Sequence, residues 1–121
     1  MSLSLYAGIA LLGGFGAVCR FLFDGAVSAR SDTSFPTGTF TVNVLGALVL
    51  GVLVGLEVSE NLIRLFALGA LGGFTTFSTW VFETHRLAED GLLRVALANI
   101  FFSLAAGIAA VWLGKVVGGL F

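Results

Sequence analysis

The chain has 121 residues, of which 58% are hydrophobic and only 11% are charged, and its formal net charge is −1. Soluble proteins carry about 25% charged residues, so this chain has too few charges to cover the surface of a water-soluble domain. The near-neutral charge offers no basic surface for a nucleic acid. Cys19 is alone, which excludes an internal disulfide or a cysteine metal cluster. The composition predicts an integral membrane protein with no nucleic-acid partner.

A helix that crosses a bilayer needs about 20 mostly apolar residues. Four stretches of the sequence meet this length, and polar segments separate them. We therefore expect an all-α membrane protein with one four-span domain. The first span lacks a positively charged start and a small residue before Cys19, which favours a retained span over a cleaved signal peptide. The expected spans cover residues 3–23, 38–56, 62–82 and 92–117.

The orientation of the spans is weakly specified, because positive charges near span ends normally set it. Four spans place both termini on one side of the membrane, together with Arg64 and Lys115. The other side carries Arg30, Arg86 and Arg94. This small difference predicts dual topology, in which oppositely inserted copies pair as an antiparallel homodimer.

Glycines recur at a spacing of four residues in three of the spans. Such small-residue stripes let helix backbones approach closely in lipid, and we expect them to form helix contacts and to explain how the chain oligomerises. The stripes are Gly51 and Gly55, Gly69 and Gly73, and Gly114 and Gly118.

The third span is the most polar, because residues 72–80 read Gly-Gly-Phe-Thr-Thr-Phe-Ser-Thr-Trp. Adjacent glycines and hydroxyl side chains that bond to the backbone weaken a helix. We expect a break at Gly72 and Gly73, whose freed backbone groups need protein or an ion as partner. The alternative is a continuous helix whose hydroxyls bond to carbonyls one turn back.

Polar residues also lie on one face of two other spans. Thr39 and Asn43 are four residues apart, as are Asn99 and Ser103. Neutral donors of this kind replace the hydration shell of an anion, although a lone Asn also serves as a contact between helices. Aromatic ring edges carry partial positive charge and attract anions, or the rings simply fill space in lipid. The aromatic residues concerned are Phe74, Phe77, Trp80 and Phe82.

Ionisable residues within the spans are few. Arg20 lies near the end of the first span, where it either snorkels to the interface or gives positive potential to an anion vestibule. Glu83 and His85 close the third span without a nucleophile or a set of metal ligands beside them. An interfacial role is therefore favoured over catalysis, and we do not expect an enzyme.

Three longer motifs, residues 13–20, 35–46 and 69–79, and a weaker one, residues 99–103, resemble the Fluc-type (CrcB) fluoride ion channels. The resemblance covers essentially the whole chain. It implies a dual-topology antiparallel homodimer with two fluoride pores in the inner (plasma) membrane. Such a channel exports fluoride passively and lowers its cytoplasmic concentration.

The resemblance also implies site residues. A structural sodium ion at the dimer centre is expected on backbone carbonyls of Gly72 and Thr75 from both subunits. Two positions depart from the family: Trp80 replaces a second pore Phe and adds an N–H donor that could face the anion, and Asn99 replaces a Tyr. The expected pore residues are Asn43, Phe77, Trp80, Ser78, Thr79, Ser103, Asn99, Thr39 and Glu83, with Arg20 in the vestibule.

Two other classes of protein are weighed against the channel. A small multidrug transporter also has four spans and dual topology, but proton-coupled export needs a carboxylate in the membrane, and residues 3–23 contain none. A non-transporting assembly subunit would explain the glycine stripes but not the polar residues of the third span. The sequence therefore favours a fluoride channel.

Overall fold

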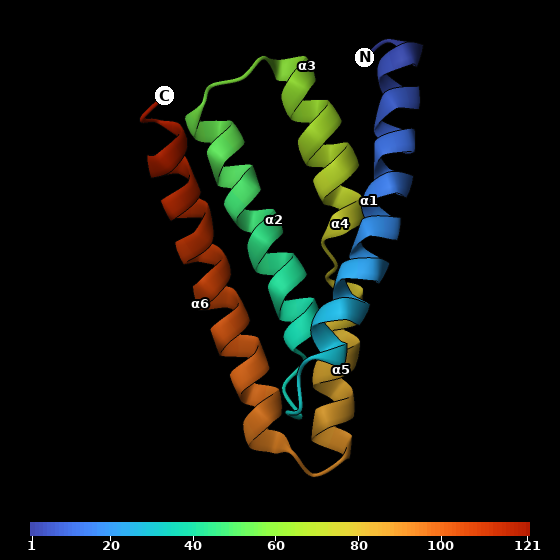
Figure 1. The fold of residues 1–121 in the computed structure, drawn as a ribbon, viewed down its shortest axis with the longest axis vertical. Coiled ribbons are helices and arrows are strands. Elements are labelled where there is room, and N and C mark those ends of the chain that lie inside the picture. The colour runs from blue at the N-terminus through green and yellow to red at the C-terminus, as the bar shows by residue number, and fades with distance from the viewer.

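The computed structural model describes residues 1–121 and is entirely helical. Four helical stretches are long and apolar enough to cross a membrane, as the sequence predicts, and this fits a multi-pass membrane protein. Both termini lie at the same end of the molecule as the α2–α3 turn (Figure 1). The elements are α1 (Leu3–Ala29), α2 (Thr37–Gly55), α3 (Glu60–Ile63), the π-helical η1 (Arg64–Leu71), α4 (Gly72–Phe74), α5 (Ser78–Glu89) and α6 (Leu93–Gly118).

Local signals explain where several helices begin. The hydroxyl of Ser2 accepts a hydrogen bond from the Leu5 amide at 3.2 Å and caps α1. Ser59 caps α3 in the same way. Gly91 separates α5 from α6 with a φ of 79°, a left-handed conformation that glycine adopts at little cost. Of these signals, Ser59 and Gly91 lie in the polar turns that separate the spans.

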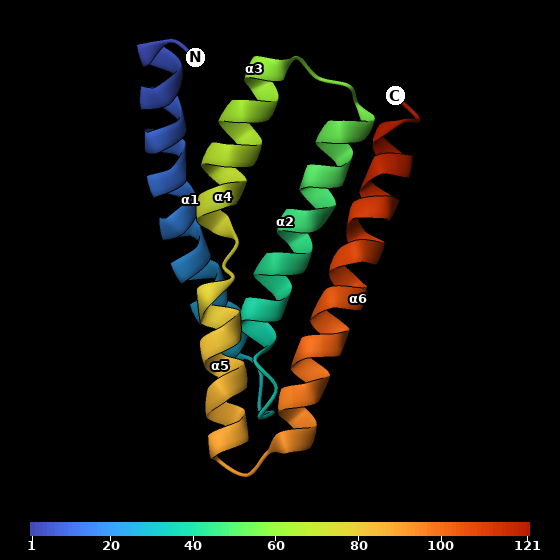
Figure 2. The same ribbon diagram turned by 180° about the vertical axis from the view of Figure 1, so that it is seen from behind.

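The closest helix pair is α2 and α6, which lie side by side along their length (Figures 1 and 2). A Cβ added at Gly51 would overlap the Val111 carbonyl, and one added at Gly114 would overlap the Leu48 carbonyl. The glycine stripes therefore form helix contacts, as expected, but the contacts lie inside one chain. The prediction that these stripes explain oligomerisation was wrong, because another helix of the same chain already occupies the space beside each glycine.

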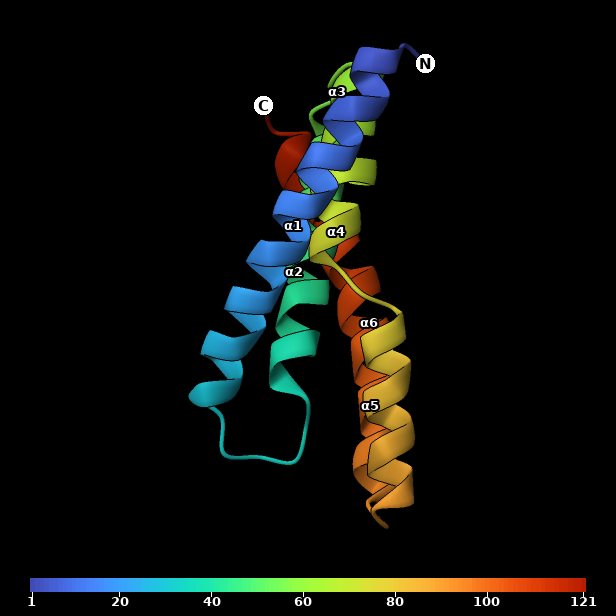
Figure 3. The ribbon, with the colours of Figure 1, turned by 90° about the vertical axis from the view of Figure 1, so that its right-hand side faces the viewer.

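The third span is broken, and its two parts pack on different neighbours. The first part, η1 and α4, packs on α1, whereas α5 packs on α6. Figure 3 shows the chain turning away from α1 between α4 and α5. The two parts therefore connect the α1 side of the molecule with the α6 side.

The break lies at residues 75–77, three residues beyond the expected position. Thr75 has extended backbone, with a φ of −88° and a ψ of 163°. Gly72 and Gly73 stay helical, so placing the break on them was wrong by three residues. Gly73 instead allows close packing, since a Cβ there would overlap the Gly13 carbonyl of α1.

Little of the chain is buried by its own atoms. Only 14 of 121 residues are buried, and large apolar side chains are exposed on all four spans. A water-soluble protein would not leave so much apolar surface exposed. This surface fits contact with lipid.

Candidate functional site

The break in the third span is held by one side chain from α2. Asn43 Nδ2 donates to the Thr76 carbonyl at 2.9 Å, and the Thr76 amide donates to Asn43 Oδ1 at 2.8 Å. The amide side chain thus replaces both backbone partners that Thr76 loses where the helix stops. Broken backbone in a membrane needs such partners, so Asn43 makes the break tolerable.

Carbonyls around the break divide into paired and unpaired ones. Arg20 of α1 donates from Nε to the Gly73 carbonyl at 3.1 Å. The carbonyls of Gly72 and Thr75 accept no hydrogen bond from backbone or side chains. Free carbonyl oxygens are ligands for hard cations, so the two predicted sodium ligands are suitable for that role.

A cavity of about 580 Å³ lies beside the break. The wall of this cavity contains polar and aromatic residues predicted for the pore and also the two candidate cation ligands. They come from α2, from both parts of the third span and from α6. The predicted residues in this wall are Asn43, Gly72, Thr75, Phe77, Trp80 and Ser103.

The two predicted pore aromatics form a pair in this wall. The rings of Phe77 and Trp80 have centroids 5.5 Å apart and planes 64° apart, an edge-to-face contact. Phe77 is 73% exposed, so its ring is not covered by its own chain. The indole N–H of Trp80 donates to the Asn99 carbonyl at 3.2 Å. The expectation that this N–H could face an anion is therefore wrong, because the indole is already paired.

A hydrogen-bonded chain joins α5 to α6 behind the aromatic pair. Asn99 is fully buried, donates to Thr84 Oγ1 at 2.8 Å and accepts from Ser103 Oγ at 3.2 Å. Thr84 donates in turn to the Trp80 carbonyl. Asn99 lines neither of the two cavities described here, so the structure places it as a support for Trp80 and Ser103. Sequence reasoning missed Thr84, although its spacing of four residues from Trp80 was a signal.

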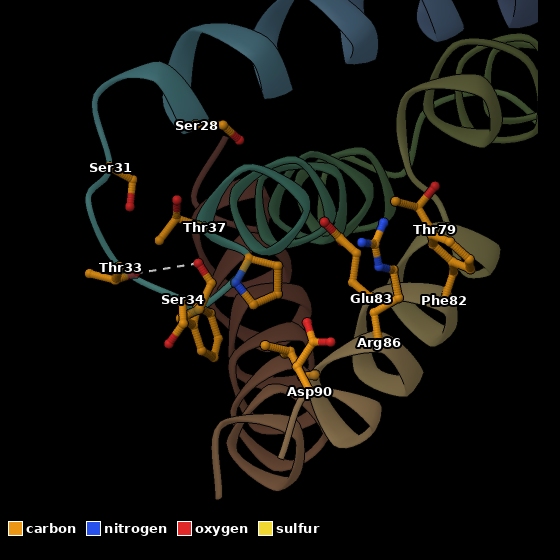
Figure 4. Close-up of a pocket in the computed structure, with 13 residues that line it drawn as sticks. Ser28, Ser31, Thr33, Ser34, Thr37, Thr79, Phe82, Glu83, Arg86 and Asp90 are labelled. Carbon is orange, nitrogen blue, oxygen red and sulfur yellow. Dashed lines mark hydrogen bonds between the residues drawn. The ribbon is translucent and has the colours of Figure 1, made fainter. Parts of the chain in front are cut away.

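A second cavity, of about 480 Å³, opens at the end of the molecule that carries the α1–α2 and α5–α6 turns. Figure 4 shows hydroxyl side chains from the α1–α2 turn on one side of it and α5 on the other. From α5, Thr79, Glu83 and Arg86 line the wall. Their spacing of four and three residues puts them on one face of the helix.

Thr39 and Glu83 meet between α2 and α5 near this cavity. Thr39 is 2% exposed, and its hydroxyl faces the Glu83 carboxylate, but the geometry falls outside that of a hydrogen bond. The structure thus brings together two residues that the sequence assigned to the pore from different spans. Thr39 lines neither cavity directly.

The first helix is longer than expected and includes a carboxylate, Asp24, in its last turns. Asp24 Oδ1 accepts from Ser28 at 3.2 Å and lies against Gly38, where any Cβ would overlap it. Gly38 therefore lets the Asp24 carboxylate and the Ser28 hydroxyl of α1 lie close to the backbone of α2. Asp24 sits near the helix end, away from the middle of the span.

Polar side chains at the break and at the start of α5 line both cavities. Thr76 lies in the wall of the cavity at the break, and its hydroxyl accepts from the Thr79 amide at 3.2 Å. Thr79 lies in the wall of the other cavity. Ser78 is exposed, and its hydroxyl lies 3.5 Å from that of Thr76. Hydroxyl groups therefore follow one another from one cavity to the next.

The sequence matches the family described as CrcB-like protein, Camphor Resistance (CrcB), over residues 7–115. The chain belongs to this CrcB family. A relative from Mycolicibacterium paratuberculosis, named fluoride-specific ion channel FluC 2, is 45% identical over 98% of both chains. A relative from Citrifermentans bemidjiense, named fluoride-specific ion channel FluC, is 42% identical over 90% of this chain and 92% of its own. The resemblance to CrcB proteins expected from the sequence is confirmed, and the curated CrcB relatives are named as channels rather than enzymes.

Proposed function

We propose that this CrcB protein is a fluoride-selective ion channel that lets fluoride leave the cell passively and so lowers its cytoplasmic concentration. One observation carries the proposal. Hydroxyl groups follow one another from Thr76, in the wall of the cavity at the helix break, to Thr79, in the wall of the cavity at the molecule's end. The names of the FluC relatives identify the anion for which such hydroxyl groups are suited.

The pore chemistry suits a small, strongly hydrated anion. Passage requires donors that replace water at each step without a site deep enough to trap the ion. Ser78, Thr79 and Ser103 are neutral donors, and the second Nδ2 hydrogen of Asn43 is another. The edge of the exposed Phe77 ring supplies weaker positive potential between them. No carboxylate or nucleotide site is required for movement down a gradient.

The channel is proposed to be an antiparallel homodimer with two pores. The balance of positive charge supports insertion in both orientations. The exposed Phe77 supports a partner surface, because one chain leaves the pore-facing ring uncovered. Reporter fusions at the C-terminus test the orientation: comparable signals from both sides are expected, and a single fixed side would contradict it.

A structural sodium ion at the dimer centre is proposed on the carbonyls of Gly72 and Thr75 from both subunits. Their freedom from hydrogen bonds supports this role. The ion would supply fixed positive charge beside the anion path. Dimer melting in sodium compared with N-methylglucamine, after purification without sodium, tests the site. A lower melting temperature without sodium is expected, and equal melting temperatures would contradict it.

Fluoride efflux from proteoliposomes, followed with a fluoride-selective electrode, tests the function. Valinomycin and potassium balance the charge that leaves with the anion. Rapid fluoride release without matching chloride release is expected. No fluoride release, or equal chloride release, would contradict the proposal.

A further inference from the structure

The cavity at the turn end of the molecule contains a single cationic side chain, Arg86, beside two carboxylates. Glu83 and Asp90 lie in the same wall as Arg86. All three come from α5 or the residue that ends it. The remaining polar wall consists of hydroxyl side chains, from Ser28, Ser31, Thr33, Ser34, Thr37 and Thr79.

The guanidinium of Arg86 points back along α5 towards the break. Its Cζ lies 5.8 Å from the centroid of the Phe82 ring, one turn closer to the middle of the span. Figure 4 shows Arg86 beside Glu83 and Phe82 on the same side of α5. The positive charge of Arg86 therefore lies closer to the middle of the span than its α-carbon does.

No carboxylate neutralises Arg86 directly. The two ion pairs of the chain join Arg64 to Glu60 and His85 to Glu89, and neither includes Arg86. Glu83 and Asp90 line the same cavity, but neither carboxylate lies within ion-pair distance of the Arg86 guanidinium. The guanidinium thus keeps donors free towards the cavity.

An unpaired guanidinium beside hydroxyl donors is a favourable position for an anion, whereas the two carboxylates oppose one. With one cation against two anions, the potential that an incoming anion meets depends strongly on this single side chain. We propose that Arg86, with the hydroxyls of Thr79 and the α1–α2 turn, forms an anion-binding position at this mouth of the pathway. This inference rests on the proposed function and assigns fluoride as the anion.

Charge changes at Arg86 and Asp90 have opposite expected effects. Removing one unit charge about 7 Å from an ion in water changes the local ion concentration roughly two- to threefold. At low ionic strength, Arg86→Gln is expected to lower fluoride flux by that factor, and Asp90→Asn to raise it. Arg86→Lys keeps the charge and is expected to retain most of the flux.

Arg94→Gln is the matched control, because it removes a positive charge at the same end of the molecule. Arg94 is exposed and lies outside the cavity wall. Efflux from proteoliposomes is compared at about 10 mM and about 300 mM of an impermeant salt, since screening lengths fall from about 30 Å to below 10 Å in this range. Only variants that elute as folded protein are compared.

The expected result is a loss for Arg86→Gln at low salt, a gain for Asp90→Asn, little change for Arg94→Gln, and smaller differences at high salt. If Arg86→Gln matches Arg94→Gln at low salt, or if Asp90→Asn fails to raise flux, the proposal is overturned. Absence of fluoride flux in the unsubstituted protein would instead overturn the proposed function.

Discussion

Replacing Asn43 with Asp probes how the break in the third span is held. In the native chain the side chain both accepts from the Thr76 amide and donates to its carbonyl, at 2.8 Å and 2.9 Å. Aspartate keeps the acceptor but puts a second oxygen against the carbonyl. The substitution removes one hydrogen bond and leaves a carbonyl facing a like partial charge.

The expected cost follows from those two changes. A part-buried carbonyl left without a donor costs about 1–3 kcal/mol, and the repulsion adds to this, so Asn43→Asp is expected to lower the free energy of unfolding by about 2–4 kcal/mol. Fluoride flux should also fall strongly, because Asn43 lines the cavity at the break and a new negative charge repels the anion.

Unfolding in detergent, followed by tryptophan fluorescence, measures the stability term. Thr41→Val is the control, because it removes a hydrogen bond of 2.7 Å to the Thr37 carbonyl within α2. That local bond is expected to contribute about 0.5–1 kcal/mol. The reasoning is refuted if Asn43→Asp destabilises the protein no more than Thr41→Val does.

Three further substitutions test other parts of the account. Gly114→Ala forces a Cβ into the backbone of α2 and is expected to destabilise the fold by about 1–3 kcal/mol. Gly107→Ala is the control, because a Cβ at Gly107 meets open space and should not destabilise the fold. Equal melting temperatures for the two variants would contradict this packing. Trp80→Phe loses the indole hydrogen bond, so the free energy of unfolding is expected to fall by about 1 kcal/mol while fluoride efflux persists. Loss of efflux would mean that the indole itself is needed. Phe77→Ile should strongly reduce efflux without unfolding the protein, because its ring is 73% exposed and little of it is buried by its own chain. Normal efflux would show that Phe77 does not line the pore.

The sequence predicted the features that depend on local composition. Four apolar stretches of sufficient length became four spans, and the Gly- and Thr-rich segment became a break. Two spans extend well beyond their predicted ends, since α1 runs to Ala29 and so includes Asp24, and α5 runs to Glu89. Hydropathy indicates which residues lie in lipid, but a helix continues into the polar interface wherever its backbone remains paired.

Features that depend on contacts between distant segments were beyond the sequence. The position of the break follows from the pairing of Asn43 with Thr76, 33 residues away. The partner of each glycine stripe depends on which helix lies opposite it, and four-residue spacing carries no such information. Asn99 illustrates the same limit, because its spacing from Ser103 suggested the pore, whereas two hydrogen bonds to α5 place it between α5 and α6.

The reversal potential of the reconstituted protein, with both anions on each side and with fluoride and chloride gradients of opposite direction, tests the central claim most directly. The measurement reports selectivity and passive movement together, since a channel's current reverses where the gradient of its permeant ion is balanced. The account predicts reversal close to the fluoride equilibrium potential at every pH. Reversal near the chloride potential, or reversal that shifts with a proton gradient, would contradict a passive fluoride channel.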